Sequence, residues 1–113
     1  MLDKKFMSMK MSDYIHDFTN HLRDAIEIGN NAHLLKTKKD FNNILICGLG
    51  GSGIGGTIVN DVILSKISIP IIATKDYSVP NFVNEKTLVI ASSYSGNTEE
   101  TIFALEKCMT FIY

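Results

Sequence analysis

The stretch that decides the fold is NILICGLGGSGIGGTIVNDVIL, residues 43–64. Ile44 to Cys47 is an unbroken apolar run, which is typical of a strand buried on both faces of a parallel sheet. Six glycines follow within nine residues. Apolar residues then recur at helical spacing, at Ile54, Ile58, Val62 and Ile63. We therefore predict a strand, a glycine-rich turn and a helix, in that order.

The glycine-rich turn predicts a site for an anion of the size of phosphate. Glycines let the backbone approach a ligand closely, and the free N–H groups of a helix's first turn favour negative charge. The alternative is that the glycines serve only a tight turn and close packing of the helix on the sheet.

The same glycines are compatible with a dinucleotide site. The pattern G-x-G-x-x-G occurs twice, beginning at Gly48 and at Gly51. Asp76 ends the next expected strand and stands where a dinucleotide fold has its ribose-binding acid. No Lys-Ser or Lys-Thr pair follows the glycines, which excludes a Walker A loop. An NAD-binding Rossmann domain is therefore an alternative.

Composition narrows the class of protein. The 113 residues allow one domain, and the content of 45% hydrophobic and 20% charged residues is ordinary for a globular chain. A net charge of -1 gives no electrostatic reason to expect nucleic acid or an acidic membrane as partner. No apolar run is long enough to span a membrane. We expect a cytoplasmic protein with Cys47 and Cys108 as reduced core thiols.

Residues 1–36 are predicted to form an N-terminal helical segment. Ser12 to Ile15 could open a helical turn. Thr19 is the expected N-cap of a helix that Gly29-Asn30-Asn31 breaks. A second short helix is expected over Ala32–Lys36. The natural start of the chain is expected at one of the later methionines, Met7, Met9 or Met11. None of the three histidines has metal-ligand spacing, so we expect no metal site; they are His16, His21 and His33.

Residues 37–113 are predicted to form an incomplete α/β domain. Ile67–Thr74 and Thr87–Ala91 read as the second and third strands, joined by a loop over Lys75–Asn84. A helix is expected from Glu99 onwards. Residues 109–113 could begin a further strand.

A second polar loop, residues 92–98, lies between the third strand and that helix. It holds four Ser or Thr residues, a glycine and an asparagine, and hydroxyl and turn N–H groups both donate to phosphate oxygens. Ser92 is expected to belong still to the strand. The alternative is an ordinary capped helix with Thr98 as N-cap. Glu99 and Glu100 fit that alternative and oppose a nearby anion unless both carboxylates turn outward.

The two loops together resemble a known family. CGLGGSGIGG at residues 47–56, followed by SYSGNTEET at 93–101, is similar to the first sugar isomerase (SIS) domain of the bifunctional phosphoglucose/phosphomannose isomerases. The resemblance covers about residues 11–108. It implies a flavodoxin-like, doubly wound parallel sheet that binds a sugar phosphate at the carboxyl ends of its strands.

The resemblance also implies roles for individual residues. Gly51 and Ser52 belong to the loop that lies against the sugar, and Ser93, Ser95 and Thr98 are the positions that hold the phosphate. The implied ligand is a hexose 6-phosphate, and the implied reaction is aldose–ketose isomerisation through an enediol, without a cofactor, in a homodimeric enzyme.

This chain departs from the family pattern in one respect. The family is roughly three times as long, and its catalytic acid/base residues lie in a second SIS domain, aided by a histidine of the partner subunit. The resemblance therefore assigns no catalytic residue here and implies a domain truncated after about three strands. A non-catalytic SIS module that binds sugar phosphates is a further alternative.

Overall fold

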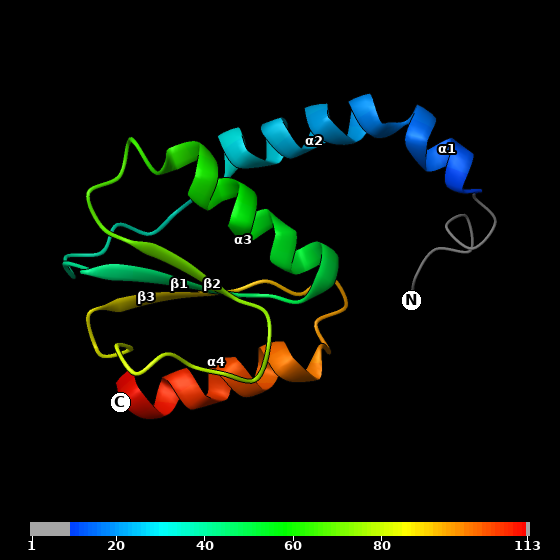
Figure 1. Cartoon of the computed structure of the whole chain (residues 1–113). Helices are drawn as coiled ribbons and strands as arrows, with labels where there is room; N and C mark the ends of the chain where they lie inside the picture. The colour runs from blue at the N-terminus through cyan, green and yellow to red at the C-terminus, as the bar shows by residue number, and fades with distance from the viewer. Residues whose placement is uncertain (1–9, 113) are drawn as a thin grey trace. The chain divides into compact units, whose positions relative to one another are not determined.

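The computed structural model describes residues 10–112, so the expected starts at Met7 and Met9 lie outside the described part, as does Tyr113 (Figure 1). The chain divides into two compact units, Met1–Thr37 and Lys38–Tyr113. No helix within residues 10–112 is long and apolar enough to cross a membrane.

The first unit holds two helices, α1 (Met11–His16) and α2 (Phe18–Asn31). Asp17, and not Thr19, is the N-cap of α2. The helix ends at Asn31, within the stretch Gly29-Asn30-Asn31 that is predicted to break it. Gly29 itself is still helical, and one glycine in a helix costs only about 1 kcal/mol relative to alanine. The predicted helix over Ala32–Lys36 is also wrong. Five residues form too few helical hydrogen bonds to offset the cost of nucleating a helix.

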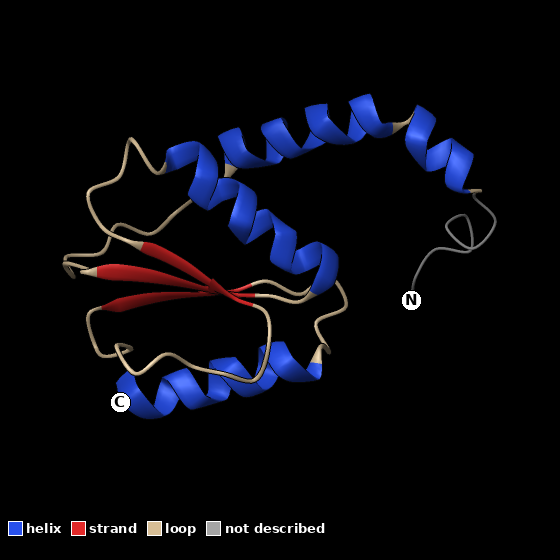
Figure 2. Cartoon of the chain, in the orientation of Figure 1, coloured by secondary structure: helices blue, strands red, loops and turns tan. Residues whose placement is uncertain are grey.

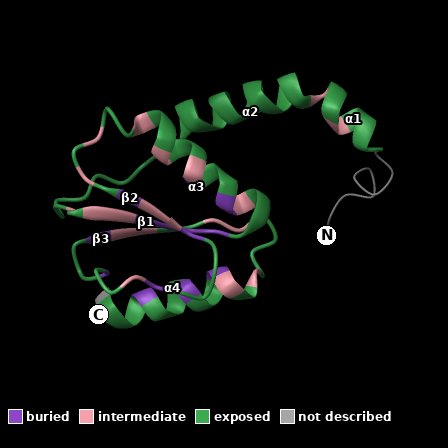
Figure 3. Cartoon of the chain, viewed as in Figure 1, coloured by how far each residue is buried: buried purple, intermediate pink, exposed green. Residues whose placement is uncertain are grey.

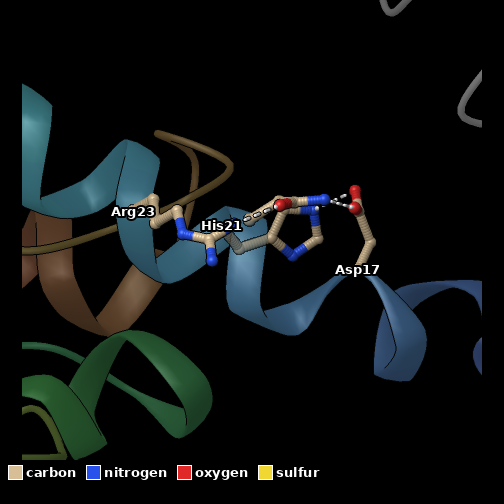
Figure 4. A network of polar contacts seen from close by, with 4 residues as sticks. Asp17, His21 and Arg23 are labelled. Atoms are coloured by element: carbon tan, nitrogen blue, oxygen red, sulfur yellow. Dashed lines mark hydrogen bonds and ion pairs between the residues drawn. The ribbon is translucent and has the colours of Figure 1, made fainter.

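A local polar network surrounds the start of α2 (Figure 4). The Asp17 carboxylate accepts a hydrogen bond from Asn20 Nδ2 at 2.5 Å and lies 3.4 Å from His21 Nε2. Arg23 donates to Asn20 Oδ1 at 3.2 Å. His21 thus has a structural partner one turn away. Within residues 10–112, no group of three or more His, Cys, Asp or Glu side chains could hold a metal ion.

The second unit is built on a parallel three-stranded sheet, as predicted. Its strands are β1 (Asn43–Cys47), β2 (Ile71–Thr74) and β3 (Thr87–Ala91), in the order β2-β1-β3. The central β1 pairs with both neighbours, so that Ile44 lies beside Ile71 on one side and Leu88 on the other. This is the order with which a flavodoxin-like sheet begins.

β2 is shorter than the predicted strand over Ile67–Thr74. Pro70 cannot donate to the ladder, and it stands just before the strand, where its carbonyl accepts from the N–H of Ile44 at 2.9 Å. The bounds predicted for β3 are confirmed.

Two helices cover the two faces of the sheet, α3 (Gly50–Ile63) on one and α4 (Glu99–Ile112) on the other (Figure 2). The hydrophobic core lies between the sheet and α4 and consists of Leu45, Cys47, Val79, Val83, Ala104 and Cys108. Figure 3 shows buried residues along the strands and the inner side of α4. The possible strand at residues 109–113 is wrong for residues 109–112, which continue α4 because no glycine or proline interrupts the helix before Ile112, while Tyr113 lies outside the described residues.

The core contains both cysteines as free, buried thiols, as predicted. The Cys47 thiol on β1 is hydrogen-bonded to the Cys108 thiol on α4. Burial, with smaller contributions from the neighbouring Cys108, raises the pKa of Cys47 to about 11. Burial also raises the pKa of Cys108, although the contact with Cys47 and the charge of Lys107 lower it in part.

Candidate functional site

The candidate site lies at the carboxyl ends of β1 and β3. These strands are neighbours, but the chain visits β2 on the other side of β1 between them. Loop 48–49 leaves β1 for α3 on one face, and loop 92–98 leaves β3 for α4 on the opposite face (Figure 1). Ligands of open α/β sheets bind at such a switch point, because the two departing loops leave a crevice between them.

Some glycines of the glycine-rich stretch, residues 48–56, are explained by packing or by backbone conformation alone. A Cβ atom at Gly53 would clash with the carbonyl oxygen of Gly48, and a Cβ atom at Gly56 would lie 2.8 Å from Ile46 Cγ2. The absence of a side chain at Gly53 and Gly56 therefore lets α3 pack close against β1. Gly50 has a φ of 57°, a left-handed conformation that side chains disfavour. For these positions, the packing interpretation of the glycine run is sufficient.

Gly51 is different. Apart from its two chain neighbours and the adjacent backbone of α3, no heavy atom lies within 4 Å of the place where its Cβ would be, and its φ is not in the left-handed region. Neither packing nor backbone conformation therefore requires glycine here. Gly51 lines an open groove, and a side chain would extend into space that the chain leaves empty.

The groove has a volume of about 630 Å³ and is lined by Leu49, Gly51, Ser52, Ser92, Ser93 and Tyr94. A single hydrogen bond joins its two walls: the N–H of Tyr94 donates to Ser52 Oγ at 3.1 Å. Ser52 accepts that bond and keeps its own hydroxyl proton available for donation. Of the lining residues within 10–112, Tyr94 alone is ionisable.

Ser93, which lines the groove, belongs to a cluster of three hydroxyl groups with Ser95 and Thr98. Ser93 Oγ and Thr98 Oγ1 lie 2.8 Å apart, and Ser95 Oγ lies 3.5 Å from Thr98 Oγ1. Two backbone N–H groups donate into the cluster, Gly96 to Ser93 at 3.0 Å and Asn97 to Ser95 at 3.2 Å. The three hydroxyls carry three protons, and their two mutual contacts use at most two. At least one proton therefore remains for an acceptor outside the cluster.

The cluster sits at the beginning of α4. The N–H of Ile102 donates to the Thr98 carbonyl at 3.0 Å, which places Thr98 at the N-cap position. The first N–H groups of a helix have no partner within the helix and make its start favourable for an anion. Neither Glu99 nor Glu100 is among the residues that line the groove.

The structure brings the five residues singled out from the sequence together in part. Gly51, Ser52 and Ser93 line the groove, whereas Ser95 and Thr98 are joined to it through the Ser93 hydroxyl. Sequence reasoning missed the lining positions Leu49 and Tyr94, although both lie inside the quoted motifs.

The expectation for Ser92 was wrong. β3 ends at Ala91, and Ser92 lines the groove. The N–H of Ser92 still donates to the Cys47 carbonyl at 2.8 Å. Ser92 therefore makes one more backbone hydrogen bond to β1 beyond the end of β3, although it lines the groove.

Asp76, the acid considered for ribose binding, is engaged in its own turn. Its Oδ1 accepts from the N–H of Ser78 at 2.7 Å, from the Ser78 hydroxyl, and from Thr74 Oγ1 at 3.3 Å. The bonds from the hydroxyl and then the N–H of Ser78 lower its pKa, with a smaller contribution from Thr74. Asp76 is not among the residues that line the groove.

Comparison of the sequence with known proteins finds relatives that are all named as isomerases of glucose phosphate. The chain is 44% identical over 96 residues to a bifunctional phosphoglucose/phosphomannose isomerase of Caldicellulosiruptor bescii, which covers 85% of this chain and 28% of the relative. It is 49% identical over 67 residues to the enzyme of the same name from Thermoplasma volcanium, covering 59% of this chain and 21% of the relative.

A probable glucose-6-phosphate isomerase of Methanococcus maripaludis is 43% identical over 76 residues, which cover 57% of this chain and 17% of the relative. The chain thus spans between about a sixth and just over a quarter of these curated relatives. No family model matches it, and no solved structure matches it significantly.

Proposed function

We propose that this chain, which is homologous to part of the bifunctional phosphoglucose/phosphomannose isomerases, is the N-terminal, phosphosugar-binding part of such an enzyme. Its ligand is a hexose 6-phosphate, bound in the groove that loop 48–49 and the first turn of α3 form with loop 92–98. The residues that contact the sugar are Gly51 and Ser52, and the phosphate is held by Ser93, Ser95 and Thr98. The protein acts in cytoplasmic carbohydrate metabolism, within an incomplete SIS domain formed by residues 37–113.

The hydrogen bond between Tyr94 N–H and Ser52 Oγ is the observation that carries this proposal. It joins the first turn of α3 to loop 92–98, through residues 42 apart in sequence, and so forms one groove at the switch point of the sheet. Hydroxyl and N–H donors surround a space free of carboxylates, which suits an anionic, hydroxyl-rich ligand.

Two observations weigh against the NAD alternative. The third strand lies beside the first, whereas the standard dinucleotide-binding sheet begins with the order 3-2-1 and places its third strand beside the second. Asp76 also uses one carboxylate oxygen in three hydrogen bonds within its own turn. The alternative of a non-catalytic SIS module predicts the same binding as our proposal and differs only in the activity of the full-length protein.

The proposed reaction of the whole enzyme is aldose–ketose isomerisation through an enediol. This chemistry needs a base within hydrogen-bond reach of the two reacting carbons. The groove offers neutral hydroxyls and one phenol, so this part of the enzyme binds and orients the sugar phosphate. The acid and base come from the remainder of the enzyme and from the partner subunit of a homodimer.

An NMR titration of the isotope-labelled 113-residue chain tests the ligand class. Fructose 6-phosphate and glucose 6-phosphate should shift the amide signals of residues 93–98 and 51–52, and NAD should leave them in place. Shifts with NAD and none with either hexose phosphate would overturn the proposal.

Alanine variants test the phosphate-binding hydroxyls. Ser95→Ala and Thr98→Ala should each weaken binding by about 1–3 kcal/mol, as expected for charge-assisted hydrogen bonds. Thr110→Ala is the matched control, because the Thr110 hydroxyl donates to the Lys107 carbonyl near the other end of α4. Thr98→Ala also needs a melting curve, since loss of an N-cap costs about 1 kcal/mol of stability. Equal affinity losses in all three variants would indicate a general folding defect and remove the hydroxyls from the site.

A further inference from the structure

Tyr94 combines a fixed backbone with an uncovered ring. Its N–H is held by Ser52, yet its side chain is 90% exposed, although a tyrosine has much apolar area to bury. Tyr77 shows the contrast: its ring packs edge-to-face on Phe103, with centroids 5.5 Å apart and planes at 72°. Packing within the second unit therefore explains the ring of Tyr77 and leaves that of Tyr94 unexplained.

Most of the residues that line the groove are small or polar, and few of them have a large apolar side chain. Three of its six lining residues are serines and one is glycine, so that only Leu49 and Tyr94 offer large apolar surfaces. A hexose ring has hydroxyls around its edge and C–H groups on its faces. Serine hydroxyls can form hydrogen bonds with the hydroxyls at the edge of the hexose, but its C–H faces need an apolar surface to pack against. A flat aromatic ring with few rotatable bonds provides such a surface at low entropic cost.

We propose that Tyr94 is a specificity-determining residue whose ring forms the wall against which the face of the hexose lies. The proposal rests on the hexose 6-phosphate function proposed above and assigns to Tyr94 the recognition of the sugar, as distinct from the phosphate. Its place in the chain supports this division. Ser93 and Ser95, on either side of it, belong to the hydroxyl cluster, so Tyr94 is the residue between two of the positions proposed to hold the phosphate.

Binding of two ligands to two variants tests the proposal. The ligands are fructose 6-phosphate and inorganic phosphate, measured by titration calorimetry or NMR on the 113-residue chain. Tyr94→Ala should weaken fructose 6-phosphate binding roughly tenfold and change phosphate binding less than twofold. Tyr94→Phe keeps the ring and loses only the hydroxyl, so it should bind both ligands as the wild type does. The backbone N–H bond to Ser52 is available in both variants, and melting curves check that each is folded.

The outcomes separate this inference from the proposed function. If the wild-type chain binds neither ligand, the proposed function fails, and the inference fails with it. If the wild type binds both and Tyr94→Ala weakens both equally or neither, only the inference is overturned. If Tyr94→Phe loses as much affinity as Tyr94→Ala, the phenol hydroxyl, and not the ring, recognises the sugar, and the wall is likewise overturned.

Discussion

Gly51 and Gly56 lie on the same helix, and the structure gives them opposite reasons to be glycine. At Gly56 the neighbouring atoms of Ile46 leave no room for a methyl group, whereas at Gly51 the chain leaves the space open toward the groove. Gly55, also on α3, has open space as well, but it is not among the residues that line the groove. This gives a matched pair of substitutions.

Gly51→Ala should leave the fold intact and impair binding. Alanine is up to about 1 kcal/mol more favourable than glycine inside a helix, so we expect Gly51→Ala and Gly55→Ala each to keep or raise the unfolding free energy in urea. Only Gly51→Ala should weaken binding of fructose 6-phosphate, because its methyl group enters the groove. Unchanged affinity in Gly51→Ala would mean that the ligand does not approach this part of the helix.

At this scale the sequence predicted the kind of loop, but not the role of each glycine. The pattern G-x-G-x-x-G fits two registers, and neither register distinguishes Gly51 from Gly56. The distinction depends on which atoms of β1 face each position, such as Ile46 Cγ2, and those atoms are set by tertiary packing.

At the scale of the elements, β1 and α4 meet at two buried thiols, Cys47 and Cys108, which belong to the same hydrophobic cluster. Because burial raises the pKa of Cys47 to about 11, the folded chain favours the neutral thiol more strongly than the unfolded chain does. The corresponding stability is fully present below the pKa of an unfolded cysteine, about 8.5, and is lost as the pH rises through the folded value.

We therefore expect the unfolding free energy to fall between about pH 9 and pH 11, and to fall less steeply in Cys47→Ala. Tyrosines and lysines titrate in the same range, so the measured quantity is the difference between the two urea-unfolding series across pH. The alanine variant is less stable at every pH because it leaves a cavity, and this cost of the cavity is the same at each pH, so the difference in slope reports on the thiol alone. Parallel curves would show that the thiol does not couple folding to pH.

Most elements of the second unit could be predicted because local patterns specify them. The apolar runs at residues 44–47 and 87–91 and the helical periodicity after the glycines matched β1, β3 and α3. The mistakes fell where local rules compete. Thr19 is a good N-cap residue, but Asp17 occupies the turn between α1 and α2 and takes that place. The site could be predicted only as two loops, because the Ser52–Tyr94 bond joins residues that no local pattern relates.

For the whole molecule, the main prediction is binding without catalysis. Among the lining residues of the groove that lie within the described part of the chain, Tyr94 alone is ionisable, and Glu99 and Glu100 are not among them. No positioned base is therefore available to move a proton between adjacent carbons of a bound sugar. The 113-residue chain should bind fructose 6-phosphate yet show no conversion to glucose 6-phosphate in a coupled dehydrogenase assay. Turnover that persists in Ser93→Ala would point to a contaminating enzyme, whereas turnover abolished by Ser93→Ala would contradict the prediction.

The central position of β1 has a consequence for how the chain folds. β1 pairs with β2 and with β3, and the pairing with β3 closes the longer loop, because Ile44 lies beside Leu88. Closing longer loops costs more entropy, and contacts distant in sequence form slowly. We expect β3 to join after β2, so that the groove appears only when the sheet is complete. A ligand of the groove would then have no binding site on partly folded chains, and its concentration would shift the folding equilibrium toward the finished sheet by mass action.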